Sequence, residues 1–293
     1  MRFDSYHPAI NLIYFVSAIG LALSFNHPVF VAVSYVCAFA YSVKLNGKKA
    51  LIFNLCLVPF IVLYSLVYSS YNHFGVTNIR QNFIGNEITL ESVIYGLVIG
   101  VIAASVIMYM SCVFAVFSSD KVVYLFGKIS PKLSLFLSIV LRSAPRIKKY
   151  AGRINTAQKG IGMSPSQGSL FMRFKNACRL ISVLITWVLE NFVESAQSMK
   201  CRGYSLKGRT AFSIYRFDNR DRSFVVTIFL LLTITGAGWA LDQTGIYYDP
   251  KIIMNDVTPL SYLFYAAYAA LLLLPMILQI AGELKYKRLI NEV

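Results

Sequence analysis

The stretch SVIYGLVIGVIAASVIMYMSCVFAVFSS, residues 92–119, contains no Lys, Arg, Asp or Glu. A membrane-spanning helix needs about 20 mostly apolar residues, so this stretch predicts one span. Three further uncharged stretches, residues 50–78, 223–241 and 257–282, predict one span each. The chain has 57% hydrophobic and only 14% charged residues, unlike an ordinary soluble domain. We therefore predict an all-α integral membrane protein.

One more uncharged stretch, residues 8–43, is too long for a single span. Asn26-His27-Pro28 interrupts it, and Asn and Pro favour a turn. We predict two short helices here, over residues 10–25 and 29–43. The total is then about six spans.

The distribution of basic residues predicts the orientation, because loops rich in Lys and Arg stay in the cytoplasm. With the amino terminus inside, the inner segments are Arg2, residues 44–49, residues 120–222 and the tail from Lys285. Of 28 Lys and Arg residues, only Arg80 and Lys251 then lie outside. The outer segments also carry the acids Glu87, Glu91, Asp242, Asp249 and Asp256. We expect a multi-pass protein of the cell membrane with both termini in the cytoplasm.

The net charge of the chain, +15, belongs to one block. Residues 121–222 hold 19 Lys and Arg against four acids, which is the chain's whole positive excess. The simplest explanation is positive-inside bias with attraction to anionic lipid. A loop of about a hundred residues with helical periodicity is, however, more typical of a domain. We predict membrane helices in residues 1–119, a cytoplasmic helical domain in 120–222, and membrane helices in 223–293.

Two long helices are expected in this block. Arg142, Arg146, Lys149 and Arg153 form one stripe of an amphipathic helix that ends at Gly160. A second helix ends at Gly203. We do not count it as a span, because residues 180–189 are only a short uncharged run.

Each of these helices ends with a basic residue and a glycine, in TAQKGIG (156–162) and in SMKCRGYSLKGRT (198–210). Taken singly, each ending is explained by an ordinary cap, because glycine accepts the left-handed conformation and a cation complements the helix dipole. Two such endings in one block suggest a pair of charged tips. Arginine suits protein contacts because its planar fork bonds a carboxylate twice.

These motifs resemble the transmembrane T component of energy-coupling factor transporters, the family of cobalt-type permease subunits. The family pattern is an Ala-Arg-Gly-like triplet at the end of each of two coupling helices, with a Tyr after the second. The second triplet is Cys201-Arg202-Gly203, followed by Tyr204, and KGRT, Tyr215 and Asp218 continue the likeness. The first is matched by Gln158-Lys159-Gly160 after Ala157. Lys159 departs from the usual Arg, and Cys201 from the usual Ala.

The resemblance implies a subunit without chemistry of its own. Its two helix tips would dock into two ABC-type ATPase subunits, and Arg202 and Lys159 would be the contacts. The same helices would hold a separate substrate-binding membrane protein, the S component, for uptake of a vitamin or metal ion. The candidate surface for that partner, or for the membrane spans, comprises Leu180, Leu184, Trp187, Val188 and Phe192. No cofactor and no metal are expected.

Other classes of function fit the sequence less well. The predicted spans lack the ionisable residues of an ion-coupled transporter. No phosphate loop precedes a Gly-Lys pair, and His7, His27 and His73 are scattered, which disfavours an ATPase or a membrane enzyme. Nothing resembles a nucleic-acid-binding motif. The permease subunit of a conventional ABC importer remains the alternative, although it more often shows a single coupling helix.

Overall fold

A computed structural model describes residues 3–72, 74–81, 87–204, 206, 208, 215–241, 243–255 and 258–291. The predictions made for Arg2, His73, Lys207, Arg209, Thr210, Asp242 and Asp256 lie outside these residues. The chain divides into two compact units, one formed by residues 1–118 and 215–293 and the other by residues 119–214.

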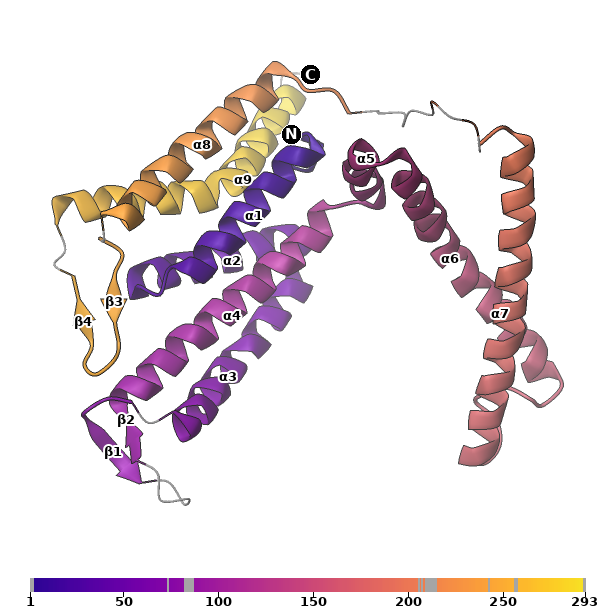
Figure 1. Ribbon diagram of the computed structural model, residues 1–293, viewed down its shortest axis with the longest axis horizontal. Helices are drawn as coiled ribbons and strands as arrows, with labels where there is room; N and C mark the ends of the chain where they lie inside the picture. Colours follow the sequence, from indigo (N-terminus) through magenta and orange to yellow (C-terminus); the bar gives the residue numbers. More distant parts are fainter. Residues whose placement is uncertain are drawn as a thin grey trace. The chain divides into compact units, whose positions relative to one another are not determined.

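The first unit is a bundle of six helices (Figure 1). They are α1 (Pro8–Ser24), α2 (Pro28–Asn46), α3 (Lys48–Tyr71), α4 (Leu90–Val116), α8 (Asn219–Ala240) and α9 (Pro259–Asn291). A short 3-10 helix, η1 (Phe3–Ser5), precedes them. Helix α2 contacts α1, α3, α4 and α9 and so lies in the middle of the bundle.

Two small antiparallel hairpins connect helices of this bundle. One pairs β1 (Asn78–Gln81) with β2 (Glu87–Thr89) between α3 and α4. The other pairs β3 (Ile246–Tyr247) with β4 (Ile253–Met254) between α8 and α9. Both hairpins lie at the end of the bundle opposite to the two chain termini (Figure 1). Between the two hairpins the chain runs along the bundle twice, in α4 and in α8, and so returns to the same end.

The core of the bundle contains several fully buried tyrosines. Tyr14, Tyr41, Tyr109 and Tyr268 are each at most 1% exposed. The hydroxyl of Tyr14 donates to the backbone oxygen of Leu272 at 2.9 Å, which joins α1 to α9. Since a buried hydroxyl needs a partner, this bond contributes to holding the first and last helices together.

The all-α membrane fold is confirmed, and the structure contains six helices long and apolar enough to span a membrane in the part that it describes. The six are not the predicted set. Helix α1 has 17 residues, because Phe25 ends it before the turn at Asn26, and it falls short of the length of a full span. Helix α7 (Leu170–Cys201), which was not predicted to be a span, is long enough and apolar enough to cross a membrane. The uncharged run 180–189 lies between Arg179 and Glu190, and the apolar residues on the far sides of these two charges extend the apolar segment beyond it.

The second unit consists of α5 (Ser119–Ile129), α6 (Pro131–Gly160) and α7. Helix α6 packs against both α5 and α7. The unit ends before Tyr215, because the chain from there on packs with the first unit, where the rings of Tyr215 and Phe217 contact His7.

Close packing of α8 on α9 requires a glycine. A Cβ on Gly238 would lie 2.7 Å from Cγ of the buried Phe264, whereas a Cβ on Gly236 would have no heavy atom within 4 Å. We expect Gly238→Ala to lower the free energy of unfolding by about 1–3 kcal/mol through overpacking. Gly236→Ala, the control on the same helix, should be neutral or stabilising by up to about 1 kcal/mol. Thermal unfolding in detergent measures both, and equal midpoints would contradict this packing.

Helix α2 begins with a histidine cap that makes its stability depend on pH. Nδ1 of His27 accepts from the backbone N–H of Val29 at 3.4 Å, and the ring stacks on Tyr265. Burial lowers the pKa of His27. The unfolded chain therefore binds a proton more readily, and the contribution of His27 is present above pH ~6.5 and lost as pH falls below it.

We expect the unfolding temperature of the protein to fall more steeply from pH 7.5 to 5 than that of His27→Asn. Asparagine keeps a capping oxygen but does not titrate. If the unfolding temperatures of the two proteins fell equally from pH 7.5 to 5, His27 would not couple folding to proton binding.

Candidate functional site

Helices α6 and α7 form an antiparallel hairpin. The rings of Tyr150 and Trp187 stack at 3.6 Å with an angle of 11° where the two helices meet. In the turn, Oγ of Ser164 donates to Oδ1 of Asn155 at 3.0 Å, and Nδ2 of Asn176 donates to the backbone oxygen of Ser164 at 3.3 Å. These contacts connect the end of α6 with the beginning of α7. The end of α7 consequently lies beside the first half of α6.

The end of α7 is a glycine cap with Arg202 at the C-cap position. Gly203 has a φ of 77°, and the N–H of Tyr204 donates to the oxygen of Met199 at 3.2 Å. The N–H of Gly203 donates to the oxygen of Lys200 at 3.1 Å. This pair of bonds is a Schellman motif, which satisfies carbonyl groups that the helix leaves unpaired. The prediction that Gly203 ends the helix in the left-handed conformation is confirmed.

The end of α6 has the same motif in a different sequence register. Its C-cap residue is Ile161, and the residue with positive φ, 75°, is Gly162. The N–H of Met163 donates to the oxygen of Gln158 at 2.9 Å. The prediction that Gly160 supplies the left-handed conformation is wrong, because Gly160 is still helical and the chain turns two residues later.

Matching the two caps changes which residues correspond. Gly162 is equivalent to Gly203, and therefore Lys159 is equivalent to Lys200 and Ile161 to Arg202. The sequence motifs predicted that Lys159 corresponds to Arg202, and they did not single out Ile161, whose exposed fraction is 68%. The sequence signal that could have placed this cap is Gly162, the second glycine of TAQKGIG.

The remaining predicted tip residues differ in exposure. Ala157, Lys159, Gly160, Cys201, Arg202 and Tyr204 are exposed, and Gly203 is half-buried. Gln158, by contrast, is 8% exposed, and its Oε1 has no hydrogen-bond partner among the described residues. Its side chain is therefore buried, unlike those of the neighbouring predicted tip residues.

The apolar side chains of α7 lie on two faces. Leu180, Leu184, Trp187 and Val188, which were predicted to face a partner, are half-buried, and Phe192 is 40% exposed. The stacked Trp187 shows that this face is partly used by α6. A second set at four-residue spacing is more exposed, at 51–59%, and comprises Ile181, Ile185, Leu189 and Val193. The sequence could not separate the two sets, because α7 is apolar on several sides.

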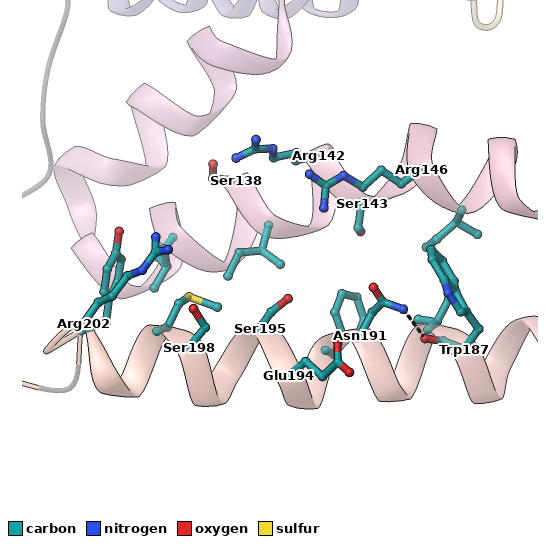
Figure 2. Close-up of a pocket in the computed structure, with 17 residues that line it drawn as sticks. Ser138, Arg142, Ser143, Arg146, Trp187, Asn191, Glu194, Ser195, Ser198 and Arg202 are labelled. Atoms are coloured by element: carbon teal, nitrogen blue, oxygen red, sulfur yellow. Dashed lines mark hydrogen bonds between the residues drawn. The ribbon is translucent and has the colours of Figure 1, made fainter.

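A groove of about 600 Å³ separates the first half of α6 from the last turns of α7 (Figure 2). Arg142 and Arg146 of α6 and Arg202 of α7 line it, together with the single carboxylate of Glu194. Among the described residues, none of these four groups has an ion-pair partner within 4 Å. The groove therefore carries unneutralised positive charge. Within the same described part of the chain, no three His, Cys, Asp or Glu side chains are placed to hold a metal ion.

These features define a class of protein: a multi-pass membrane protein with a separate helical hairpin whose two ends are capped. The chain is similar to proteins named energy-coupling factor transporter transmembrane protein EcfT. It is 34% identical over 101 residues to that of Bacillus selenitireducens, over 34% of this chain and 37% of the relative. It is 30% identical over 110 residues to that of Leuconostoc gelidum subsp. gasicomitatum, over 35% of this chain and 41% of the relative.

The chain thus spans about two fifths of the length of these curated relatives. No family model matches it. The resemblance to the T component that the residues predicted is confirmed over about a third of the chain.

The two glycines of the predicted triplets should respond differently to substitution. We expect Gly203→Ala to lower the free energy of unfolding by about 1–2 kcal/mol, because alanine is strained at positive φ. Gly160→Ala should be neutral or stabilising by up to about 1 kcal/mol, because Gly160 is helical and nothing lies within 4 Å of an added Cβ. Gly162→Ala should lower the free energy of unfolding as Gly203→Ala does, because Gly162 also has a positive φ. Thermal unfolding and proteolysis at the helix ends measure these effects, and a larger loss at Gly160 than at Gly203 would reverse the cap assignment.

Proposed function

We propose that this chain is the energy-coupling transmembrane subunit of an energy-coupling factor importer. It transmits the motion of two ABC-type ATPase subunits to a separate S component that binds a vitamin or metal ion. The observation that supports this most directly is the pair of identical caps at the ends of two crossed helices in a membrane protein similar to EcfT. ATP is hydrolysed by the partners, and this chain is not an enzyme.

The separation of the two helix ends suits two partners. Arg202, at the end of α7, lines the same groove as Arg142 of α6. Lys159 lies in the last turn of α6. At about 1.5 Å of rise per residue, α6 advances about 25 Å from Arg142 to Lys159. Tips this far apart reach two ATPase subunits rather than one site on a single subunit.

The two tips would bind differently. Arg202 at the C-cap of α7 presents a guanidinium group that can bond a carboxylate with two hydrogen bonds. The equivalent position of α6 is the apolar Ile161, and Lys159 lies two residues before it. We infer that Arg202 makes the stronger, charge-assisted contact and that Ile161 and Lys159 make a weaker, mixed one.

The surface for the S component lies on α7. The exposed set of Ile181, Ile185, Leu189 and Val193 extends the predicted set of Leu180 to Phe192 around the helix. An apolar surface of this kind fits a membrane partner. The excess of Lys and Arg in residues 120–222 supports a cytoplasmic position for the hairpin and both termini, in the cell membrane.

The test is purification of the tagged protein from native membranes, scored for co-purifying ATPase subunits and for ATP hydrolysis. We expect Arg202→Ala to reduce ATPase recovery at least about tenfold, because removing one partner of a buried charge pair is costly. Lys159→Ala should reduce it less, and Arg202→Lys should restore part of the loss.

Lys148→Ala is the control, because it removes an exposed cation from α6 away from both tips. Equal ATPase recovery with Arg202→Ala and Lys148→Ala, or no ATPase with the unaltered protein, would refute the coupling role.

A further inference from the structure

The groove between α6 and α7 has two kinds of lining. Its polar part contains the guanidinium groups of Arg142, Arg146 and Arg202 and four serines, at positions 138, 143, 195 and 198. Its apolar part includes Leu135, Ile139, Ile147, Val188, Phe192 and Met199. A ligand that fills such a groove has an anionic group and a hydrocarbon chain in one molecule.

The charge of the groove selects the anionic group. Three guanidinium groups face one carboxylate, and none of these has an ion-pair partner among the described residues. Figure 2 shows that the side chains of Arg142 and Arg146 both extend along α6 toward the end of the groove at which Arg202 of α7 lies. Planar guanidinium groups with nearby hydroxyls are well suited to a phosphate, whose oxygens accept several hydrogen bonds.

The surroundings of the groove select the hydrocarbon chain. On the first half of α6, beside the groove, Leu133, Phe136 and Val140 are 41%, 63% and 39% exposed. This run is too short to cross a bilayer, and an amphipathic helix with exposed apolar residues lies at a membrane interface. Basic pockets at that level bind the head groups of anionic lipids.

We propose that the groove between α6 and α7 binds one anionic phospholipid. The phosphodiester lies between Arg142 and Arg146, and the acyl chains lie along the apolar side toward Phe192 and Trp187. Arg202 closes the end of the groove. The lipid fills the space between α6 and α7 on one side of the Tyr150–Trp187 stack and keeps the distance between the two helices constant there.

Arg142 and Arg146, which would bind the phosphodiester, are not among the proposed ATPase contacts, so the proposal is tested on the isolated protein. Trp187 lines the groove, and the other of the two tryptophans, Trp239, is 67% exposed on α8. In a Trp239→Phe background, Trp187 becomes the only tryptophan. The protein is placed in mixed phosphatidylglycerol and phosphatidylcholine nanodiscs in which either one lipid or the other carries brominated acyl chains, which quench nearby tryptophan.

We expect brominated phosphatidylglycerol to quench Trp187 more than brominated phosphatidylcholine at the same mole fraction. Arg142→Gln with Arg146→Gln should shift half-maximal quenching to at least about tenfold more phosphatidylglycerol, since each basic residue contributes to binding at the surface. The matched control is Lys148→Gln with Lys149→Gln, which removes the same charge from exposed positions of the same helix outside the groove.

Four results would overturn the proposal. Equal quenching by the two brominated lipids in the unaltered protein would show that the groove does not select an anionic lipid, and this comparison needs no substitution. Equal shifts in both double variants would assign the effect to general surface charge. Reversal of quenching by inorganic phosphate, at the concentration at which the lipid acts, would identify a site for free anions, and reversal by an acidic peptide would identify a protein-binding groove.

Discussion

The stacking of Tyr150 on Trp187 is the contact on which the geometry of the second unit depends. The two rings lie face to face at 3.6 Å and bury apolar area where the helices meet. Because they meet within two long helices rather than at their ends, α6 and α7 cross and then diverge. The antiparallel pairing separates the two tips along α6, and the divergence opens the groove that contains Arg142, Arg146 and Arg202. The proposed coupling surface and the proposed lipid site thus follow from one contact.

The first unit obeys a different constraint. In a bilayer, every backbone polar group must be satisfied within the protein, so the chain crosses as helices and turns outside. The histidines of the two His-Pro pairs, at His7 and His27, begin α1 and α2 by accepting a backbone N–H while the following proline occupies the first helical position. Small residues then permit close helix contact, as at Gly238 against Phe264 and at Gly96 against Ser65.

Much of the architecture was predictable because the signals are local. Long uncharged runs predicted α3, α4, α8 and α9, and the turn at Asn26 predicted the break between α1 and α2. Judging which helices are long enough to span was less successful, since helix ends are determined by caps such as the Asp218–Asp221 pair before α8 and not by composition. The candidate site was found through its basic-glycine endings, but the register at Gly160 was wrong. Both Gly160 and Gly162 are compatible with a stop, and only the backbone shows which of them adopts positive φ.

The sequence by itself determined that this is a helical membrane protein, that its positive charge is concentrated in one block, and that Arg202 ends a helix. These properties depend on residue type and on spacing within a single element. The tertiary structure decided that Ile161 corresponds to Arg202, that Gln158 is buried, and that three arginines from two helices share a groove. The match of Ile161 with Arg202 follows from the backbone conformation at the two helix ends, which residue type alone leaves open. The burial of Gln158 and the shared groove depend on packing between residues that are distant in the sequence.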